Sequence, residues 1–310
     1  MVEKIESDAK ENKQIKEQVY RSLWADVWSQ FRTHHGALAG VGVFTIILLS
    51  VLIGPYVYDT DPQYLDMRAR NQGPSLEHPF GTDNVGRDML AQVLAGGRIS
   101  LAVGFTAMAV SITIGVLIGI FAGYFRLLDG PLMRLTDLFI ALPLLPLLLV
   151  IIMLFRDTLR NAFGPETGIF ILVVFVIGIT SWMQTARIVR GSVLAIKERE
   201  FILAANSIGT RQRRVIIRHI FPNVLSPVMV SATLGIASAI IIESALSFLG
   251  LGFPSDFPTW GRLLYDGVNY IDITPSRIIW PGLAISLTVL SVNYMGDGIR
   301  DALDPRIRIR

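Results

Sequence analysis

The chain carries few side chains of the kinds that enzymes use for hydrolysis or metal binding. It has no cysteine, so disulfides and thiolate metal sites are excluded. Its four histidines are His34, His35, His78 and His219. None of them shares a recognisable site with a nucleophile or with a cluster of metal ligands. We therefore expect neither a catalytic residue nor a metal site in this chain.

The sequence also lacks the phosphate-binding loop of ATPases, which has the pattern G-x-x-x-x-G-K-[ST]. Four of the five lysines lie in the N-terminal tail, and the fifth, Lys197, follows an isoleucine rather than a glycine. We therefore expect the chain to bind no cofactor, and any ATP-driven work must depend on another subunit.

The composition is that of a membrane protein. Hydrophobic residues make up 52% and charged residues 17%, with a mean hydropathy of +0.51; soluble domains contain about 25% charged residues. The net charge of +3 is too small to indicate a nucleic-acid-binding protein. A membrane-spanning helix needs roughly 20 mostly apolar residues. Six segments meet this requirement and predict an all-α polytopic protein: 37–57, 99–124, 135–155, 168–186, 225–249 and 278–295.

The distribution of basic residues predicts the orientation. If the N-terminus is cytoplasmic, 20 of the 28 lysines and arginines fall on the cytoplasmic side and 8 on the other side. Both termini and the segment 187–224 should then be cytoplasmic. Apolar residues recur every four positions in the N-terminal tail, which predicts an amphipathic helix in the inner membrane interface or, alternatively, one packed on a soluble partner. They are Ile15, Val19, Leu23, Val27 and Phe31.

The most basic segment, EFILAANSIGTRQRRVIIRHIFPN (200–223), lies between the fourth and fifth spans. Its pattern predicts a short helix over 198–208 that ends at Gly209 in a left-handed conformation. A second basic helix should follow and stop near Pro222. The two helices would form an elbow with a small-residue face available to a partner. Alternatively, the segment is an ordinary basic loop that only sets the topology. The members of the predicted face are Phe201, Ala204, Ala205 and Ile208.

This segment resembles the cytoplasmic loop of permease subunits of bacterial binding-protein-dependent ABC importers. The family signature is Glu-Ala-Ala, three residues, glycine, and a proline about a dozen positions later. Leu203 stands at the glutamate position, and Glu200, one turn earlier, is a candidate to supply the charge. The signature is matched at Ala204, Ala205, Gly209 and Pro222. Further stretches resemble the second permease subunit of the dipeptide, oligopeptide and nickel group: HPFGTDNVGRDMLAQVLAGGRISLAVG, ARIVRGSVLAIKEREF, ESALSFLGLG, TWGRLL and GDGIRDALDPR.

The resemblance implies a type I ABC importer permease fold in the bacterial inner membrane. It implies a heterodimer with a second permease, two cytoplasmic ATP-binding subunits that bind ATP and Mg, and an extracytoplasmic solute-binding protein. We expect a cytoplasmic tail (1–36), a six-helix permease domain (37–299) that includes the coupling loop, and a C-terminal tail (300–310). Short peptides are the expected cargo; nickel complexes, opines and oligosaccharides are alternatives. The residues expected to couple to the ATPase are Glu200, Phe201, Leu203, Ala204, Ala205, Ile208 and Gly209, with His219 and Pro222 at the end of the loop.

Three residues are candidates for the translocation path. Glu243 is an ionisable group near the end of the fifth span; it either faces the path or accepts hydrogen bonds from loop amides such as those of Gly250 or Gly252. Pro143 and Pro146 predict a kink in the third span. The loop 253–273 is aromatic and acidic, which suits either contact with a binding protein or anchoring at the membrane interface by Trp260, Tyr265 and Tyr270.

Two other classes of function compete with this interpretation. An ion-coupled secondary transporter would show two related halves and charged groups near the membrane midplane, but the charges of this chain cluster at the ends of the spans. An intramembrane enzyme would need paired polar residues in facing spans, and the sequence shows no such pair.

Overall fold

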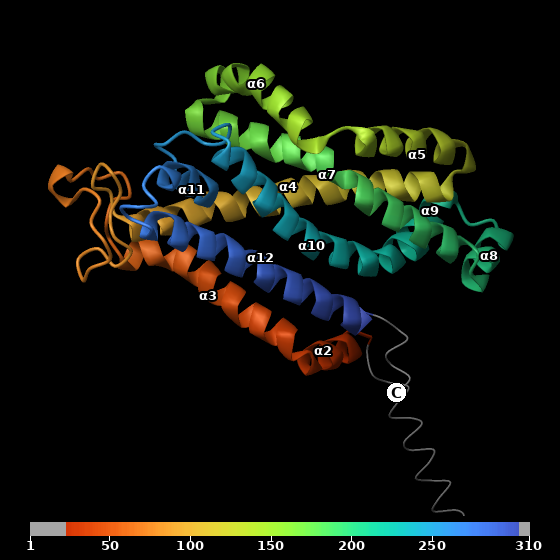
Figure 1. Cartoon of the computed structure of the whole chain (residues 1–310). Coiled ribbons are helices and arrows are strands. Elements are labelled where there is room, and N and C mark those ends of the chain that lie inside the picture. Colours follow the sequence, from red (N-terminus) through yellow and green to blue (C-terminus); the bar gives the residue numbers. More distant parts are fainter. Residues whose placement is uncertain (1–22, 304–310) are drawn as a thin grey trace, which may run out of the picture.

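The computed structural model describes residues 23–303, with side chains from residue 27 onward. These residues form helices and no strand, apart from an isolated bridge between Thr82 and Asp88. Five helices are long and apolar enough to cross a membrane, and one bent pair brings the number to six if it is counted as one span. The long helices run side by side along one direction (Figure 1). The expected all-α architecture is therefore confirmed, with five crossings and a sixth where the bent pair is counted as one span.

The long helices extend beyond the predicted spans. Helix α4 begins ten residues before the predicted start at 99, and α7 ends eleven residues after the predicted end at 186. The helix α12 runs past residue 299, where the C-terminal tail was expected to begin. The five single crossings are α3 (His35–Val57), α4 (Met89–Tyr124), α7 (Pro165–Lys197), α9 with α10 (Gln212–Val215 and Phe221–Phe248, joined by a π-helical turn, Ile216–Ile220) and α12 (Ser276–Leu303).

The third predicted span, 135–155, is wrong as a single helix. Instead α5 (Arg126–Ala141) and α6 (Leu144–Phe163) meet at an angle of 89°. Pro143 lies before the first turn of α6, and it restricts the preceding Leu142 to an extended conformation with ψ 135°. Pro146 lies within the first turn of α6, where backbone N–H groups have no helical partner, so it removes no hydrogen bond. The expected kink is a complete break caused by Pro143.

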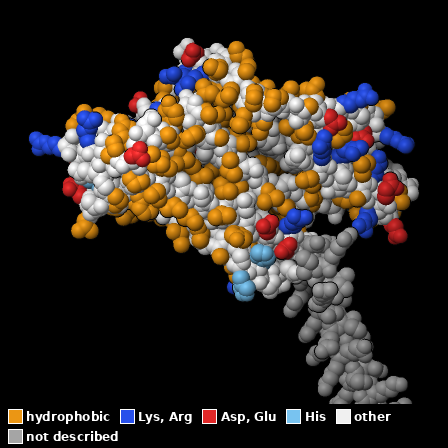
Figure 2. Space-filling model, in the orientation of Figure 1, with side chains coloured by type: hydrophobic (Ala, Val, Ile, Leu, Met, Phe, Trp, Pro, Cys, Tyr) orange, Lys and Arg blue, Asp and Glu red, His pale blue; other side chains and the backbone are white. Residues whose placement is uncertain are grey.

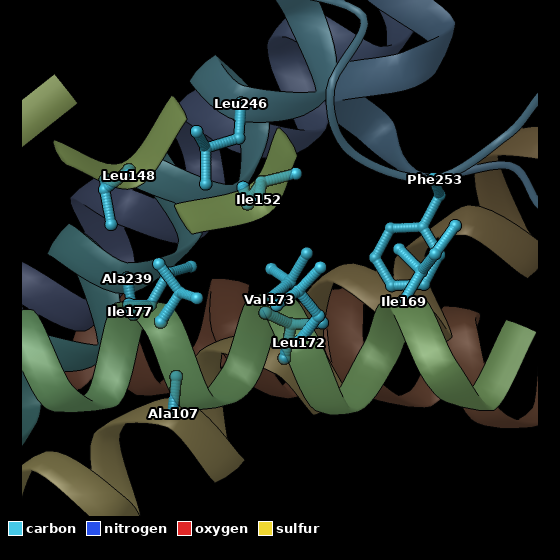
Figure 3. Packing of buried hydrophobic residues seen from close by; sticks show 12 residues of the cluster. Ala107, Leu148, Ile152, Ile169, Leu172, Val173, Ile177, Ala239, Leu246 and Phe253 are labelled. Carbon is cyan, nitrogen blue, oxygen red and sulfur yellow. The ribbon is translucent and has the colours of Figure 1, made fainter. Parts of the chain in front are cut away.

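Helices α4 and α7 approach each other closely along a row of glycines. Gly115, Gly119 and Gly123 are spaced four apart on α4, and a β-carbon on any of them would come within 2.6–2.8 Å of α7 atoms. Glycines at this spacing let helix backbones approach closely in membranes. Beside this seam lies the main apolar core, to which α4, α6, α7 and α10 contribute (Figure 3).

The N-terminal helices pack along the C-terminal one. Helices α3 and α12 lie side by side, and a β-carbon on Gly40 of α3 would lie 2.7 Å from the carbonyl oxygen of Ser291 (Figure 1). The short α2 (Leu23–Thr33) precedes them, and Phe31 lies against Gly298 of α12. The predicted amphipathic helix is thus present from Leu23 onward. Part of its apolar face packs against α12 of the same chain. Ile15 and Val19 lie outside the described residues.

The surface has the pattern that a bilayer requires. Hydrophobic side chains cover the middle of the visible face, and charged side chains gather toward its two ends (Figure 2). Large apolar side chains along the helices remain exposed, such as Ile46, Val150 and Phe175, which are 66%, 54% and 55% exposed. This band, together with the long apolar helices, identifies a multi-pass membrane protein.

The end of the bundle opposite α8 (Glu200–Ser207) is closed by the 58–88 segment, which includes a 3-10 turn (Met67–Ala69), and by α11 (Trp260–Val268) (Figure 1). Arg277 joins these parts: its guanidinium donates to Asn84 Oδ1 and to the Asp266 carbonyl, both at 3.0 Å, and lies 4.1 Å from the centre of the Tyr270 ring.

Trp260 is 1% exposed and its indole N–H donates to the Val93 carbonyl at 2.9 Å. The expected role of Trp260 as an interfacial anchor is therefore wrong, because its ring lies in the protein core.

Candidate coupling site and transport path

The short helix α8 is attached to the bundle by two buried side chains. Ile202 is fully buried and Ala205 is 8% exposed. They belong to an apolar cluster formed by the neighbouring ends of three long helices. The other buried members of this cluster are Val116, Ile120 and Tyr124 of α4, Val189 and Val193 of α7, and Val215, Ile220, Val224 and Val228 of the α9–α10 run. Helix α8 is thus attached through Ile202 and Ala205 to an apolar cluster that it shares with the ends of α4, α7 and the α9–α10 run.

The opposite side of α8 is apolar and uncovered. Phe201 is 46%, Leu203 50% and Ile208 82% exposed, and Ala204 is exposed between them. The predicted face therefore needs one correction. Ala205 points into the chain's own core, because α8 uses the i, i+3 pair Ile202 and Ala205 to pack on the bundle, and Leu203 takes its place on the exposed side.

Helix α8 ends where the sequence predicts. Gly209 has φ +76°, the left-handed region that favours glycine. The Thr210 N–H donates to the Ala205 carbonyl at 3.1 Å, and the Gly209 N–H donates to the Asn206 carbonyl at 3.0 Å. These two bonds form a Schellman motif, which caps the last carbonyls of a helix. The chain is thereby turned sharply into α9.

The second helix of the elbow does not stop at Pro222. Pro222 lies in the first turn of α10, and the helix continues from α9 through the π-helical turn (Ile216–Ile220). There the Phe221 N–H donates to the Ile216 carbonyl, five residues earlier. The wider turn relieves the clash that a proline ring makes with the carbonyl four residues before it. His219 lies in this turn, with its ring 6.2 Å from that of Phe201.

Charged groups of the elbow have no partner among the described residues. Glu200 is exposed in the first turn of α8, without a hydrogen bond or ion pair. Arginines line an open hollow of about 860 Å³ beside the Gly209 turn; these are Arg211, Arg213, Arg214 and Arg218, all exposed. The elbow therefore presents an apolar face next to a basic one, a combination suited to binding another macromolecule.

Glu243 is fully buried at the end of α10 near α11. Its carboxylate accepts hydrogen bonds from the hydroxyl groups of Ser247 at 2.8 Å, Ser100 at 3.1 Å and Ser244 at 3.5 Å. The Ser100 hydroxyl also accepts from the Trp260 N–H at the start of α11, at 3.2 Å. The expected bonds from loop amides of Gly250 or Gly252 are absent from the described part of the chain, and the hydroxyls replace them. This geometry fastens α4, α10 and α11 to one another.

The break between α5 and α6 opens a hollow in the middle of the bundle. The hollow has a volume of about 360 Å³ and is lined by α4, α7, α10 and both sides of the break. Pro143 and Pro146 shape it indirectly, since their neighbours Ile140 and Leu144 form part of its wall. A smaller hollow of about 190 Å³ adjoins it and shares Thr180, Met183 and Gln184 with it.

Two features of this region were not predicted from the sequence: the polar residues of α7 at this hollow and the glycine seam beside it. The seam had a readable signal, because Gly115, Gly119 and Gly123 form two successive G-x-x-x-G motifs. The sequence signal for Gln184 was weak, because a single glutamine within an apolar run does not show what its side chain faces.

Known proteins resemble the chain along most of its length. Residues 115–309 match the family described as the binding-protein-dependent transport system inner membrane component. Residues 22–74 match the N-terminal TM domain of oligopeptide transport permease C. The dipeptide transport system permease protein DppC of Alkalihalophilus pseudofirmus is 37% identical over 93% of this chain and 91% of its own length. The oligopeptide transport system permease protein OppC of Escherichia coli is 39% identical over 99% of this chain and 100% of its own length.

A relative from Pectobacterium atrosepticum, the glutathione transport system permease protein GsiD, is 35% identical over 95% of both chains. Among solved structures, a chain of the MetNI methionine ABC transporter in an inward-facing conformation has a TM-score of 0.55. The two sequences are 17% identical, and the match covers 70% of this chain and 98% of the MetNI chain. It therefore supports only the fold. The chain therefore belongs to the family of binding-protein-dependent transport system inner membrane components, the permease subunits of ABC importers.

Proposed function

We propose that the chain is one of two permeases of an ATP-driven importer of short peptides, and that α8 is the element through which the motor acts on it. The peptide cargo is supported by relatives named for dipeptides, oligopeptides and glutathione that align with nearly the whole chain. The observation that carries the coupling role is the two-sided packing of α8. One side places Ile202 and Ala205 in the apolar cluster shared with the ends of three crossing helices, and the other is an uncovered apolar face.

Each side of α8 has its own part in the proposed coupling. The exposed residues Phe201, Leu203, Ala204 and Ile208 enter a groove on a cytoplasmic ATPase subunit, and Glu200 or the neighbouring arginines pair with charges at its rim. ATP and Mg are bound by two such subunits and not by this chain. Gly209 fixes the end of the helix, and His219 and Pro222 lie in the segment that returns the chain to the membrane.

The buried side carries the movement into the membrane. Because Ile202 and Ala205 contact the cluster formed by α4, α7 and α10, a displacement of α8 moves the neighbouring ends of those helices together. Packed cores resist continuous deformation, so such a displacement favours rigid-body movement of the permease, as alternating access requires.

The orientation follows from what lies at each end of the bundle. Helix α8 and the basic elbow lie at one end, whereas α11 and the 58–88 segment lie at the other (Figure 1). We place the α8 end and both termini in the cytoplasm of a bacterium, with residues 1–36 and 300–310 as tails of the 37–299 permease domain. The opposite end then faces an extracytoplasmic solute-binding protein.

Reconstitution of the importer tests this function. The chain, a second permease, two ATPase subunits and a secreted binding protein from the same bacterium are placed in proteoliposomes, and uptake of radiolabelled tri-L-alanine is measured. We expect uptake that requires ATP and the binding protein, and that Ala204→Arg abolishes while the complex still forms. Uptake by the chain alone under an ion gradient would instead establish a secondary transporter. Uptake of a nickel complex, an opine or an oligosaccharide in place of the peptide would assign one of those cargoes.

A further inference from the structure

The hollow at the α5–α6 break lies near the middle of the membrane-spanning helices. Its lining includes Met108 of α4, Ser181 and Gln184 of α7, and Ser231 and Gly235 of α10. Gln184 stands thirteen residues from the end of α7 at Lys197, which is roughly 20 Å along an α-helix. The hollow is therefore well separated from α8 and from both charged ends of the bundle.

Three polar side chains at this hollow have no hydrogen-bond partner within the described chain. They are Gln184, which is exposed, and the half-buried Ser181 and Ser231. Hydroxyl groups elsewhere in these helices bond to the carbonyl four residues earlier, as Thr106, Thr113 and Ser192 do at 2.6, 2.7 and 3.0 Å. A polar group left without a partner in hydrocarbon is costly. The side chains of Gln184, Ser181 and Ser231 are therefore expected to face water or a polar ligand rather than lipid.

The backbone at the break leads to the same conclusion independently. Helix α5 ends at Ala141 and α6 begins at Leu144, and residues 141–146 are all exposed. The carbonyls at the end of α5 lose their helical partners, and one weak bond, from the Leu142 N–H to the Phe139 carbonyl at 3.4 Å, closes the turn. Non-helical backbone at membrane depth is tolerated where it is buried in protein or lines a water-filled cavity. Since residues 141–146 are exposed, a water-filled cavity is the fitting environment.

We propose that Gln184, Ser181 and Ser231 form a contact subsite in the translocation path that hydrogen-bonds the main-chain amides of a passing peptide. This rests on the proposed function. The residues that line the two hollows include no Lys, Arg, Asp or Glu, so the subsite does not select for the charge of the cargo. The carboxamide of Gln184 both donates and accepts hydrogen bonds, as a peptide group does. Such a subsite suits a path that must pass peptides of many sequences.

The absence of native cysteine in this chain permits a direct test of exposure. Single cysteines replace Gln184, Ser231 and, as a lipid-facing control, Ile46 in the complete importer. A charged, membrane-impermeant methanethiosulfonate should modify Gln184→Cys and Ser231→Cys but leave Ile46→Cys unmodified. Tri-L-alanine with ATP should slow the modification. If the two path variants react no faster than Ile46→Cys, or if peptide gives no protection, the subsite is refuted.

Uptake measurements test the recognition of main-chain amides. Gln184→Leu should lower the uptake rate of tri-L-alanine roughly two- to tenfold, the effect of losing one hydrogen bond. Because the contact is with the backbone, tri-L-lysine and tri-L-glutamate should be affected by the same factor. Ser192→Ala on the same helix is the matched control, since that hydroxyl bonds to its own helix.

The outcomes separate the two proposals. If the unmodified importer takes up no peptide, the proposed function fails. If it takes up peptide and Gln184→Leu behaves like Ser192→Ala, or if the loss depends on peptide charge, only the subsite fails.

Discussion

Gly119 of α4 lies so close to Val189 of α7 that a β-carbon on Gly119 would stand 2.7 Å from Val189 Cβ and 2.7 Å from the Ala186 carbonyl oxygen. Gly119→Ala should therefore separate the two helices and destabilise the protein by about 1–3 kcal/mol, as overpacking of a core does. Thermal unfolding of the purified complex in detergent measures the change. Gly191→Ala on α7 is the control, because no atom lies within 4 Å of a β-carbon there. Equal melting temperatures for the two variants would contradict the close packing.

The adjacent residues Ala204 and Ala205 of α8 should differ in how readily a partner subunit can reach them. A cysteine at the exposed Ala204 should form a crosslink to an ATPase subunit, whereas one at Ala205, which is 8% exposed, should react poorly because it faces the chain's own core. Short bifunctional thiol reagents and gel analysis of the complex provide the measurement. A cysteine at Tyr270, at the opposite end of the bundle, serves as the negative control. Crosslinking to the ATPase from Tyr270 would reverse the orientation.

Glu243 should matter for stability rather than for passage of the solute. Glu243→Leu would leave the hydroxyls of Ser100 and Ser247 without their acceptor and should cost roughly 2–4 kcal/mol, the effect of breaking a buried hydrogen-bond network. Glu243→Gln retains an acceptor and should recover most of the stability. Uptake per folded complex should be unchanged in Glu243→Gln. A Glu243→Gln complex that is stable but fails to transport would place Glu243 in the translocation path instead.

Tyr58, just beyond α3, should titrate abnormally. Burial, followed by its hydrogen bond to Asp88 at 2.8 Å, raises the pKa of Tyr58 to about 12 from an ordinary value of 10. Because the folded state holds this proton more tightly, its contribution to stability is complete below pH 10 and is lost as the pH rises from 10 to 12. The absorbance difference at 295 nm between the unmodified protein and Tyr58→Phe should therefore show a transition near pH 12. A transition near pH 10 would contradict the buried hydrogen bond.

The sequence predicts the elements that depend on local chemistry. Apolar length alone located the five unbroken crossings, and Gly209 marked the end of α8, because a left-handed residue there suits glycine above other residues. The exposed face of α8 was predicted only in part. Its period was right, but helical spacing cannot show which side of a short apolar helix packs on its own chain, and so Ala205 was misplaced.

The errors at prolines have a common cause. The effect of a proline depends on its position within a helix and on what the neighbouring backbone does to accommodate it. Pro143 separates two helices, Pro146 costs no hydrogen bond in the first turn of α6, and Pro222 is accommodated by a π-helical turn. Likewise, the role of Glu243 depends on three serines, of which Ser100 lies 143 residues away in the sequence. Only the tertiary structure brings such partners together.

Helix α7 runs without interruption from Pro165 to Lys197, so Gln184 and the end of α7 that precedes α8 belong to one continuous helix. Over the roughly 20 Å between Gln184 and Lys197, a tilt of about 10° shifts one end by about 3.5 Å relative to the other, more than the length of a hydrogen bond. A modest tilt of α7 is thus sufficient to make or break hydrogen bonds at Gln184. A single unbroken helix therefore links these two positions directly, without a chain of intermediate side chains.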